Sequence, residues 1–301
     1  MAKPNLLLCF DAFGTLFRPK GAVAQQYAHV ARQCGLTGFS DKELSSRLLA
    51  AIKDERELNP NYGKATGLGA TKWWTNVIHK TFTPLIPKNQ SLPPTLVPKL
   101  LHRFSSSEGY EAQRCLVPAI RFLKRRNSIQ GVDKVVIGVV TNSDDRVPSV
   151  LSSFGLNVSP ARYGSSEETS ALAGAQYDID FHCMSYDVGF EKPDRRIFDA
   201  AELMLSRIIT GRHVESLAEV DLGSWQKVYV GDEYAKDVVG ASGAGWNPVL
   251  LDPDGNETEV ASLEACPPQP LHDVFKRHAV VRVRSIRDLA TWLTGAELDA
   301  E

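Results

Sequence analysis

Four short polar motifs contain most of the side chains in this sequence that could do chemistry. They cover residues 11–16, 140–143, 191–194 and 230–237. Each motif directly follows a hydrophobic run or precedes a helical pattern, where a buried strand or its following loop would end. Because open α/β sheets bind ligands at the carboxyl ends of their strands, we expect the four motifs to meet at one edge of a sheet.

The first and fourth motifs supply carboxylates. Asp11 ends a hydrophobic run and is followed by Gly14 and Thr15, a pattern typical of a tight turn. A carboxylate at such a strand end can act as a nucleophile or as a metal ligand. Asp232 ends another run, and Asp237 lies on the helical turn that follows. With Asp11, these two acids could surround a hard divalent cation such as Mg²⁺, although acids are also common at helix starts without a metal.

The second and third motifs supply groups that suit an anion. Thr141 and Asn142 offer a hydroxyl and an amide to anionic oxygens, although such residues also cap helices and form turns. Lys192, fixed by the following proline, can give a positive charge to a phosphate or a carboxylate, although most lysines are simply solvated. Each motif is weak evidence alone, and their order along the chain makes the set specific.

The elements that must position these motifs alternate between strand and helix. Short, continuous aliphatic runs are typical of strands buried on both faces of a parallel sheet. The alternation predicts a doubly wound, mainly parallel, Rossmann-like α/β fold. The predicted strands cover residues 5–10, 134–140, 180–185, 227–230, 248–251 and 279–283, and the predicted helices cover 118–126, 195–209, 235–244 and 289–293, the last opened by a capping box at 285–288.

The interval between the first and second motifs has a different character. It shows no clear strand, and a capping box at residues 40–43 opens one of several helical patterns. This predicts a helical domain at residues 18–116, inserted into an α/β core made of residues 1–17 and 117–301. The helices of the insertion are expected near residues 22–33, 41–57, 71–82 and 95–104. Two polar stretches of the core, at residues 157–176 and 211–224, are expected to be surface loops.

The composition excludes several classes of protein. The chain has 301 residues, of which 43% are hydrophobic and 23% charged, as in folded globular proteins. Lys and Arg number 34 and Asp and Glu 36, so neither nucleic acid nor a membrane surface is an expected partner. No apolar run approaches the ~18 residues of a membrane-spanning helix. The five cysteines form no close pair, which favours a reducing compartment and predicts a location in the cytoplasm or the nucleus.

Taken together, the four motifs resemble those of the haloacid dehalogenase (HAD) superfamily, and the inserted helical segment is similar to that family's cap domain. Residues 59–63, 72–75 and 192–198 are similar to one branch of it. That branch contains the haloacid dehalogenase-like hydrolase domain-containing protein three and the rhythmically expressed gene two proteins. The resemblance extends over residues 6–293.

The resemblance implies a phosphohydrolase that works through an aspartyl phosphate. Asp11 is expected to attack phosphorus, and Thr141 and Lys192 are expected to bind the phosphate oxygens as further catalytic residues. Thr15 and Asn142 are expected to help bind the phosphate. The implied substrate is a small phosphorylated metabolite, either a phosphate ester or an acyl phosphate.

The resemblance also implies a Mg²⁺ cofactor. Its expected ligands are Asp11, the backbone carbonyl of Phe13, Asp232 and Asp237. The metal would neutralise the phosphate, so that catalysis consists mainly of positioning and charge stabilisation.

Phe13 departs from the pattern of the family's phosphatases. They have a second Asp two residues after the nucleophile, which protonates the leaving alcohol and later activates water. Phe13 can do neither. A general acid or base typically contributes ~10²–10⁴-fold to the rate, so this replacement favours a substrate with a good leaving group.

Two alternatives follow from this departure. An aromatic residue at position 13 resembles the metal-free 2-haloacid dehalogenases, but these have a neutral residue where this chain has Asp232. The other alternative is a low-activity or non-catalytic protein that works by binding, with Trp73, Trp74 and Phe82 as a partner surface. Aromatic residues on one side of a helix more commonly pack its own core.

Overall fold

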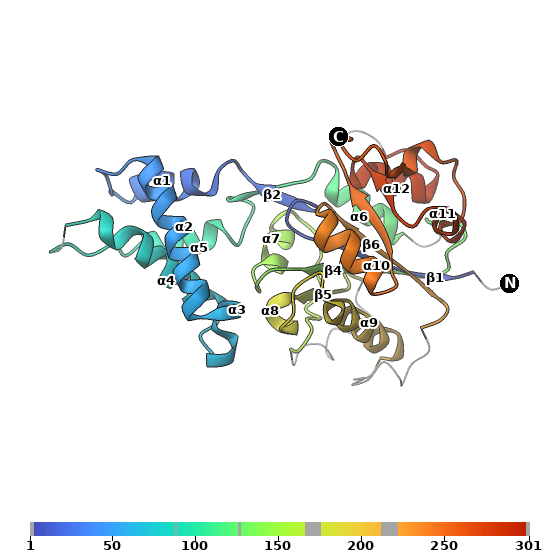
Figure 1. Cartoon of the computed structure of the whole chain (residues 1–301), viewed down its shortest axis with the longest axis horizontal. Coiled ribbons are helices and arrows are strands. Elements are labelled where there is room, and N and C mark those ends of the chain that lie inside the picture. Colours follow the sequence, from blue (N-terminus) through green and yellow to red (C-terminus); the bar gives the residue numbers. More distant parts are fainter. Residues whose placement is uncertain (1–2, 88, 126–127, 166–175, 212–221, 299–301) are drawn as a thin grey trace. The chain divides into compact units, whose positions relative to one another are not determined.

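The computed structural model of the protein describes residues 3–87, 89–125, 128–165, 176–211 and 222–298. The chain divides into two compact units, of which the first is α/β and the second mainly helical (Figure 1). The first unit comprises Met1–Arg18, Ala112–Ser143 and Phe154–Glu301, and the second comprises Pro19–Glu111 and Asp144–Ser153. Residues 144–153, which the sequence places in the α/β core, thus group with the helical unit.

The α/β unit is built on a seven-stranded parallel sheet with the strand order β5-β4-β1-β6-β7-β9-β8. This confirms the predicted doubly wound α/β fold. The strands are β1 (Asn5–Phe10), β4 (Val135–Thr141), β5 (Phe181–Met184), β6 (Trp225–Gly231), β7 (Asn247–Leu251), β8 (Ala261–Ser262) and β9 (Val281–Val283).

The central strand β1 explains why helices must cover both faces of this sheet. Every residue of β1 after Asn5 is apolar and fully buried, and successive side chains point to opposite faces. On one face, Leu7 and Cys9 share a core with helix α9 (Arg195–Thr210) and with Ala241 of α10 (Val239–Gly243). Helices α6 (Leu116–Lys124) and α12 (Ile286–Thr294) pack against each other (Figure 1).

Local signals define the ends of these helices. Asp194 accepts a hydrogen bond from the backbone N–H of Arg196 at the start of α9, and Gly211, in the left-handed conformation, ends this helix. Ser285 accepts from the backbone N–H of Asp288, which is one of the two hydrogen bonds of the predicted capping box of α12. Among the residues of this unit that the structure describes, the remaining helices are α8 (Ser185–Val188), the π-helical turn η6 (Tyr234–Val238), η7 (Leu263–Ala265) and α11 (Leu271–Arg277).

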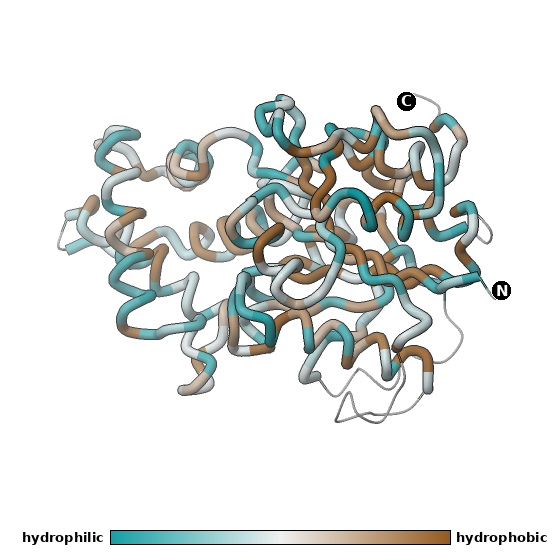
Figure 2. The backbone as a smooth tube through the Cα atoms, turned by 45° about the vertical axis from the view of Figure 1, so that its right-hand side comes forward, coloured by the Kyte–Doolittle hydropathy of each residue, from teal (hydrophilic) through white to brown (hydrophobic). Residues whose placement is uncertain are grey.

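The helical unit has a core of its own. Trp73 and Phe82 on α4 are buried inside it, which agrees with a packing role for these aromatic residues. Its helices alternate between hydrophobic and hydrophilic stretches (Figure 2). They are α1 (Val23–Gln33), α2 (Asp41–Leu58), α3 (Pro60–Gly63), η1 (Lys64–Thr66), α4 (Ala70–Phe82), η2 (Thr83–Leu85), α5 (Leu96–Arg103) and α7 (Val147–Ser153).

Trp74 differs from Trp73 and Phe82 on α4, because it is only half-buried. Its indole N–H donates to the Asp144 carboxylate at 2.7 Å, and the Arg146 guanidinium lies 4.4 Å from the centre of its ring. Arg146 also donates two side-chain hydrogen bonds to Asp144. These contacts explain why the segment that begins at Asp144 groups with the helical unit.

The structure also contains elements that the sequence does not predict. Strands β2 (Phe17–Pro19) and β3 (Tyr110–Ala112) pair with each other, although no strand is expected within 18–116. Strands of three residues are too short to show a reliable alternation. Of the two predicted loops, residues 166–175 and 212–221 lie outside the described residues. The described part of the chain contains no helix that is long and apolar enough to span a lipid bilayer.

Candidate active site

The register of the sheet brings the first, second and fourth motifs together. Phe10, the last residue of β1, is paired with Val139 on β4 and with Val230 on β6. The N–H of Asp11 continues this ladder by donating to the carbonyl of Val230 at 2.9 Å. Thr141 lies two residues after Val139 on β4, and Asp232 lies two residues after Val230 on β6. Asp11 is therefore flanked by the second motif on one side and by the fourth motif on the other.

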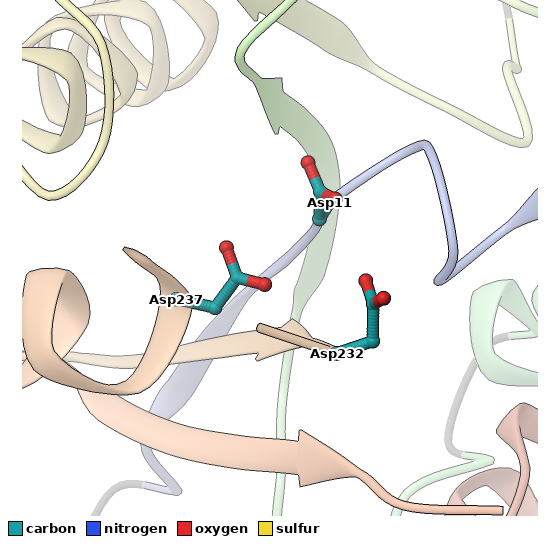
Figure 3. Close-up of side chains that lie close together, drawn as sticks. All are labelled: Asp11, Asp232 and Asp237. Atoms are coloured by element: carbon teal, nitrogen blue, oxygen red, sulfur yellow. The ribbon is translucent and has the colours of Figure 1, made fainter. Parts of the chain in front are cut away.

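The three predicted acids form one cluster. Asp11, Asp232 and Asp237 each offer a carboxylate oxygen, and these oxygens all lie within 4.8 Å of one another. Figure 3 shows that Asp11 comes from the end of β1, Asp232 from the end of β6 and Asp237 from the helical turn beyond it. Asp11 and Asp237 are buried. Carboxylate oxygens at this spacing are the ligands that a hard divalent cation prefers.

Lys192 of the third motif connects two of these acids. Its ammonium donates hydrogen bonds to Asp11 Oδ1 at 2.6 Å, to Asp237 Oδ1 at 2.8 Å and to the hydroxyl of Tyr229 at 2.7 Å. The lysine is buried, with 4% of its surface exposed. Burial alone would lower the pKa of Lys192, but the charges of Asp11 and Asp237 outweigh burial and raise that pKa. The lysine therefore remains positively charged.

The electrostatics of the cluster favour a bound cation. Burial raises the pKa of Asp232 to about 6, and the charges of Asp11 and Asp237 add to this effect, while a 2.9 Å hydrogen bond from the Thr15 hydroxyl opposes it. Burial also raises the pKa of Asp237, against the pull of Lys192. Three carboxylates and one ammonium carry excess negative charge when all four are ionised, and a divalent cation would balance it. The residues present therefore fit a Mg²⁺ ion.

Two glycines allow the acids to come this close. A Cβ atom on Gly14, whose φ is +85°, would lie 2.1 Å from Asp232 Oδ2. A Cβ atom on Gly231 would lie 2.3 Å from Asp237 Cγ. Both contacts are far shorter than packed atoms allow, so both positions need a residue without a side chain.

Replacing Gly231 by Ala is therefore expected to displace the Asp237 carboxylate. We expect the Gly231→Ala variant to bind Mg²⁺ about 10–100-fold more weakly, as is typical when groups that orient metal ligands are disturbed. Titration calorimetry of the folded protein measures this effect. Gly243→Ala is the matched control, because nothing lies within 4 Å of a Cβ atom at that position. Equal Mg²⁺ affinity in the two variants would contradict the assignment of Asp237 to the metal site.

Asn142 contacts the third motif. Its Oδ1 accepts from the backbone N–H of Lys192 at 2.7 Å, and its Nδ2 donates to the backbone carbonyl of Lys192 at 3.0 Å. The Asn142 carboxamide therefore binds both the backbone N–H and the backbone carbonyl of Lys192. The direct phosphate contact expected for Asn142 stays a prediction. Thr141, also expected to bind the phosphate, is buried at the end of β4.

Position 13 is occupied by a packed aromatic ring. Phe13 is half-buried, and its ring lies edge-on to that of Phe17, with the ring centres 4.8 Å apart. The Phe17 ring in turn lies 6.0 Å from that of Phe154. The side chain of residue 13 thus takes part in a hydrophobic contact and has no proton to give. The metal contact expected for its backbone carbonyl stays a prediction.

Tyr229 is a site residue that the motifs do not reveal. It lies on β6 and is fully buried, and its hydroxyl donates to the carbonyl of Val140 at 2.7 Å while accepting from Lys192. Burial, followed by the charges of Asp11 and Asp237, raises the pKa of Tyr229, so the phenol stays neutral. A tyrosine between two valines of a predicted strand was the available signal, because a buried tyrosine hydroxyl usually has a hydrogen-bond partner.

Comparisons with known proteins find similarity over most of the chain. A family model described as haloacid dehalogenase-like hydrolase matches residues 6–245. The chain is 31% identical over 246 residues to an uncharacterised hydrolase of Schizosaccharomyces pombe, which covers 82% of this chain and 90% of that protein. It is 26% identical over 263 residues to haloacid dehalogenase-like hydrolase domain-containing protein 3 of Danio rerio, covering 86% of this chain and 90% of that one.

Further similarity is found with a fly protein and with solved structures. The chain is 25% identical over 252 residues to the rhythmically expressed gene 2 protein of Drosophila melanogaster, which covers 81% of this chain and 82% of that protein. A 2-haloacid dehalogenase from Pseudomonas syringae has a similar structure, with a TM-score of 0.52 and 17% identity, covering 97% of this chain and 98% of that one. At this level of identity, the likeness concerns the fold alone.

Proposed function

Because the chain belongs to the haloacid dehalogenase-like hydrolase family, we propose that it is a Mg²⁺-dependent phosphohydrolase with Asp11 as its nucleophile. The observation that carries this proposal is the cluster formed by Asp11, Asp232 and Asp237 beside Lys192. One carboxylate suffices for a nucleophile, and the other two have a clear use as metal ligands. The inserted helical unit is the proposed cap domain and would select the substrate.

The first step is the attack of Asp11 on phosphorus. A carboxylate is itself a nucleophile, so no base has to remove a proton before the attack. One oxygen of Asp11 forms a bond to phosphorus, and the bond between phosphorus and the leaving oxygen breaks. The leaving group departs with the electron pair of that bond, and the phosphoryl group remains on Asp11.

Charge stabilisation accompanies this transfer. Lys192 brings a buried positive charge next to Asp11, and we assign to this charge, together with Thr141, the stabilisation of the phosphoryl oxygens. Asp11, the Phe13 carbonyl, Asp232 and Asp237 would hold the Mg²⁺ ion. When bound, this ion neutralises part of the phosphate charge. Water then attacks phosphorus, which releases inorganic phosphate and restores Asp11.

Phe13 restricts the substrates that this site can process. With a hydrophobic ring at the position of the usual acid, the leaving group receives no proton from residue 13. An acyl phosphate can react without such a proton, because its leaving group is a carboxylate that is stable as an anion. We therefore propose that acyl phosphates, or esters with comparably good leaving groups, are the favoured substrates.

Phosphate release from acetyl phosphate and from p-nitrophenyl phosphate tests this function. The assay compares the full chain with Mg²⁺, the full chain with a chelator, and the Asp11→Asn variant. We expect turnover only when both Mg²⁺ and Asp11 are present. Chloride release from 2-chloropropionate that persists in chelator would instead establish a dehalogenase. That result is not expected, because the Asp232 carboxylate next to Asp11 would repel a carboxylate substrate.

A further inference from the structure

The hydroxyl of Tyr229 bridges two parts of the site that come from different strands and loops. It lies 2.7 Å from the carbonyl oxygen of Val140, the residue before Thr141, and 2.7 Å from the ammonium nitrogen of Lys192. Thr141 and Lys192 are the two residues assigned to the phosphoryl oxygens. One phenol therefore contacts both the strand end that carries Thr141 and the tip of the Lys192 side chain.

The direction of each hydrogen bond follows from the available protons. A carbonyl oxygen can only accept, so the single proton of the Tyr229 hydroxyl is directed at Val140. An ammonium can only donate, so Lys192 directs one proton at the lone pair of that hydroxyl. Its other two protons are directed at Asp11 and Asp237. All three N–H bonds of Lys192 thus have an acceptor, which fixes the rotation of the ammonium group.

We propose that Tyr229 is a positioning residue for the reaction, which holds the Lys192 ammonium in a fixed place relative to Asp11 and to the end of β4 that carries Thr141. This inference rests on the proposed function, in which Lys192 and Thr141 bind the same phosphoryl group. The hydroxyl of Tyr229 would not touch the substrate. It would act through Lys192, as Asn142 does on the backbone of the same residue.

The surroundings of the ring indicate that the hydroxyl is not needed for packing. The Tyr229 ring lies edge-on to that of Phe198 with ring centres 5.1 Å apart, and the Phe198 ring lies 5.6 Å from that of Trp246. A phenylalanine at position 229 could fill the same space and keep these ring contacts. It would remove only the oxygen atom, and with it both hydrogen bonds. Tyr229→Phe is therefore a specific probe of the hydroxyl.

The first experiment follows the ammonium of Lys192 directly by NMR of the full chain with ¹⁵N-labelled lysine side chains. A buried ammonium with three acceptors exchanges its protons slowly, and Lys192→Met identifies its signal by loss. We expect Tyr229→Phe to accelerate this proton exchange by about tenfold or more, because one N–H bond loses its acceptor. Tyr27→Phe is the matched control, since Tyr27 is buried in the helical unit. Unchanged exchange in Tyr229→Phe would overturn the proposal.

The second experiment measures the consequence for catalysis with acetyl phosphate and Mg²⁺. We expect Tyr229→Phe to lower kcat by about tenfold with a smaller change in KM, because a misplaced charge affects the transition state most. In a Lys192→Met background, Tyr229→Phe should cost nothing further. A general loss of packing would instead lower kcat by the same factor in both backgrounds, and this result would refute positioning through Lys192.

The two experiments separate this inference from the proposed function. The NMR measurement needs no turnover, so it tests the link between Tyr229 and Lys192 even if the wild-type chain releases no phosphate. Absence of wild-type turnover would count against the phosphohydrolase. It would also remove the reaction for which Tyr229 is proposed to position Lys192, whatever the NMR result.

Discussion

Replacement of Asp11 by Asn is expected to abolish phosphate release from acetyl phosphate. The carboxamide has nearly the same shape as the carboxylate, and its oxygen can still accept the hydrogen bond that Lys192 now donates to Asp11. The site should therefore keep its fold but lose its nucleophile, because an amide oxygen is a poor one. Loss of a nucleophile typically costs about 10⁴–10⁶-fold in turnover. A sensitive phosphate-release assay with the purified variant measures this loss.

Asp199→Asn provides the matched control for this variant. Asp199 lies on α9 and pairs at the surface with Arg195, four residues earlier, at 3.2 Å. The same chemical change there should leave turnover unaltered. Substantial turnover by Asp11→Asn, alongside a normal Asp199→Asn variant, would refute Asp11 as the nucleophile.

Introduction of an acid at position 13 is expected to produce the largest gain in turnover. Phe13→Asp would place a carboxyl group two residues after the nucleophile, where it could protonate an alcohol leaving group and then activate water. General acid–base catalysis contributes ~10²–10⁴-fold, so we expect turnover of alkyl phosphates to rise by about 10²-fold. Acetyl phosphate should gain much less, because its leaving group needs no proton. Steady-state rates with both substrates test this difference.

Phe13→Asn is the control that separates acid catalysis from a change of shape. Both substitutions remove the ring that now packs against Phe17. Both are therefore expected to cost some stability, and only Phe13→Asp gains a proton donor. An equal rise in both variants would show that the Phe13 ring merely obstructs the site. No rise in a folded Phe13→Asp variant would show that the missing acid does not limit turnover.

Much of the α/β fold could be predicted from the sequence, because its strands are buried on both faces. Such strands appear as continuous aliphatic runs, and the predicted strand at 5–10 coincides with β1. The features that escaped prediction are short or depend on distant partners. The three-residue strands β2 and β3 owe their existence to pairing with each other. Residues 144–153 join the helical unit through contacts of Asp144 and Arg146 with Trp74, which spacing along the chain cannot show.

The candidate site, like the fold, could be predicted from the sequence only in part. Asp11 and Asp232 could be proposed from their motifs because each follows the end of a strand, and Lys192 because it precedes a proline and the start of a helix. The contacts among these side chains could not be foreseen. Tyr229 belongs to no motif, and its role depends on two hydrogen bonds to residues far away in the sequence. The two hydrogen bonds between the Asn142 side chain and the backbone of Lys192 likewise form only in the folded chain.

Detection of a phosphoryl group on Asp11 would test the central claim most directly. The full chain would be mixed with acetyl phosphate and Mg²⁺, quenched in acid during turnover, digested and analysed by mass spectrometry. The account predicts one phosphorylated peptide, the one that contains Asp11. Its label should be removed by hydroxylamine, as expected for an acyl phosphate, and should be absent when a chelator replaces Mg²⁺. Turnover without any phosphoryl group on this peptide, or labelling that is unaffected by the chelator, would contradict a metal-dependent mechanism through Asp11.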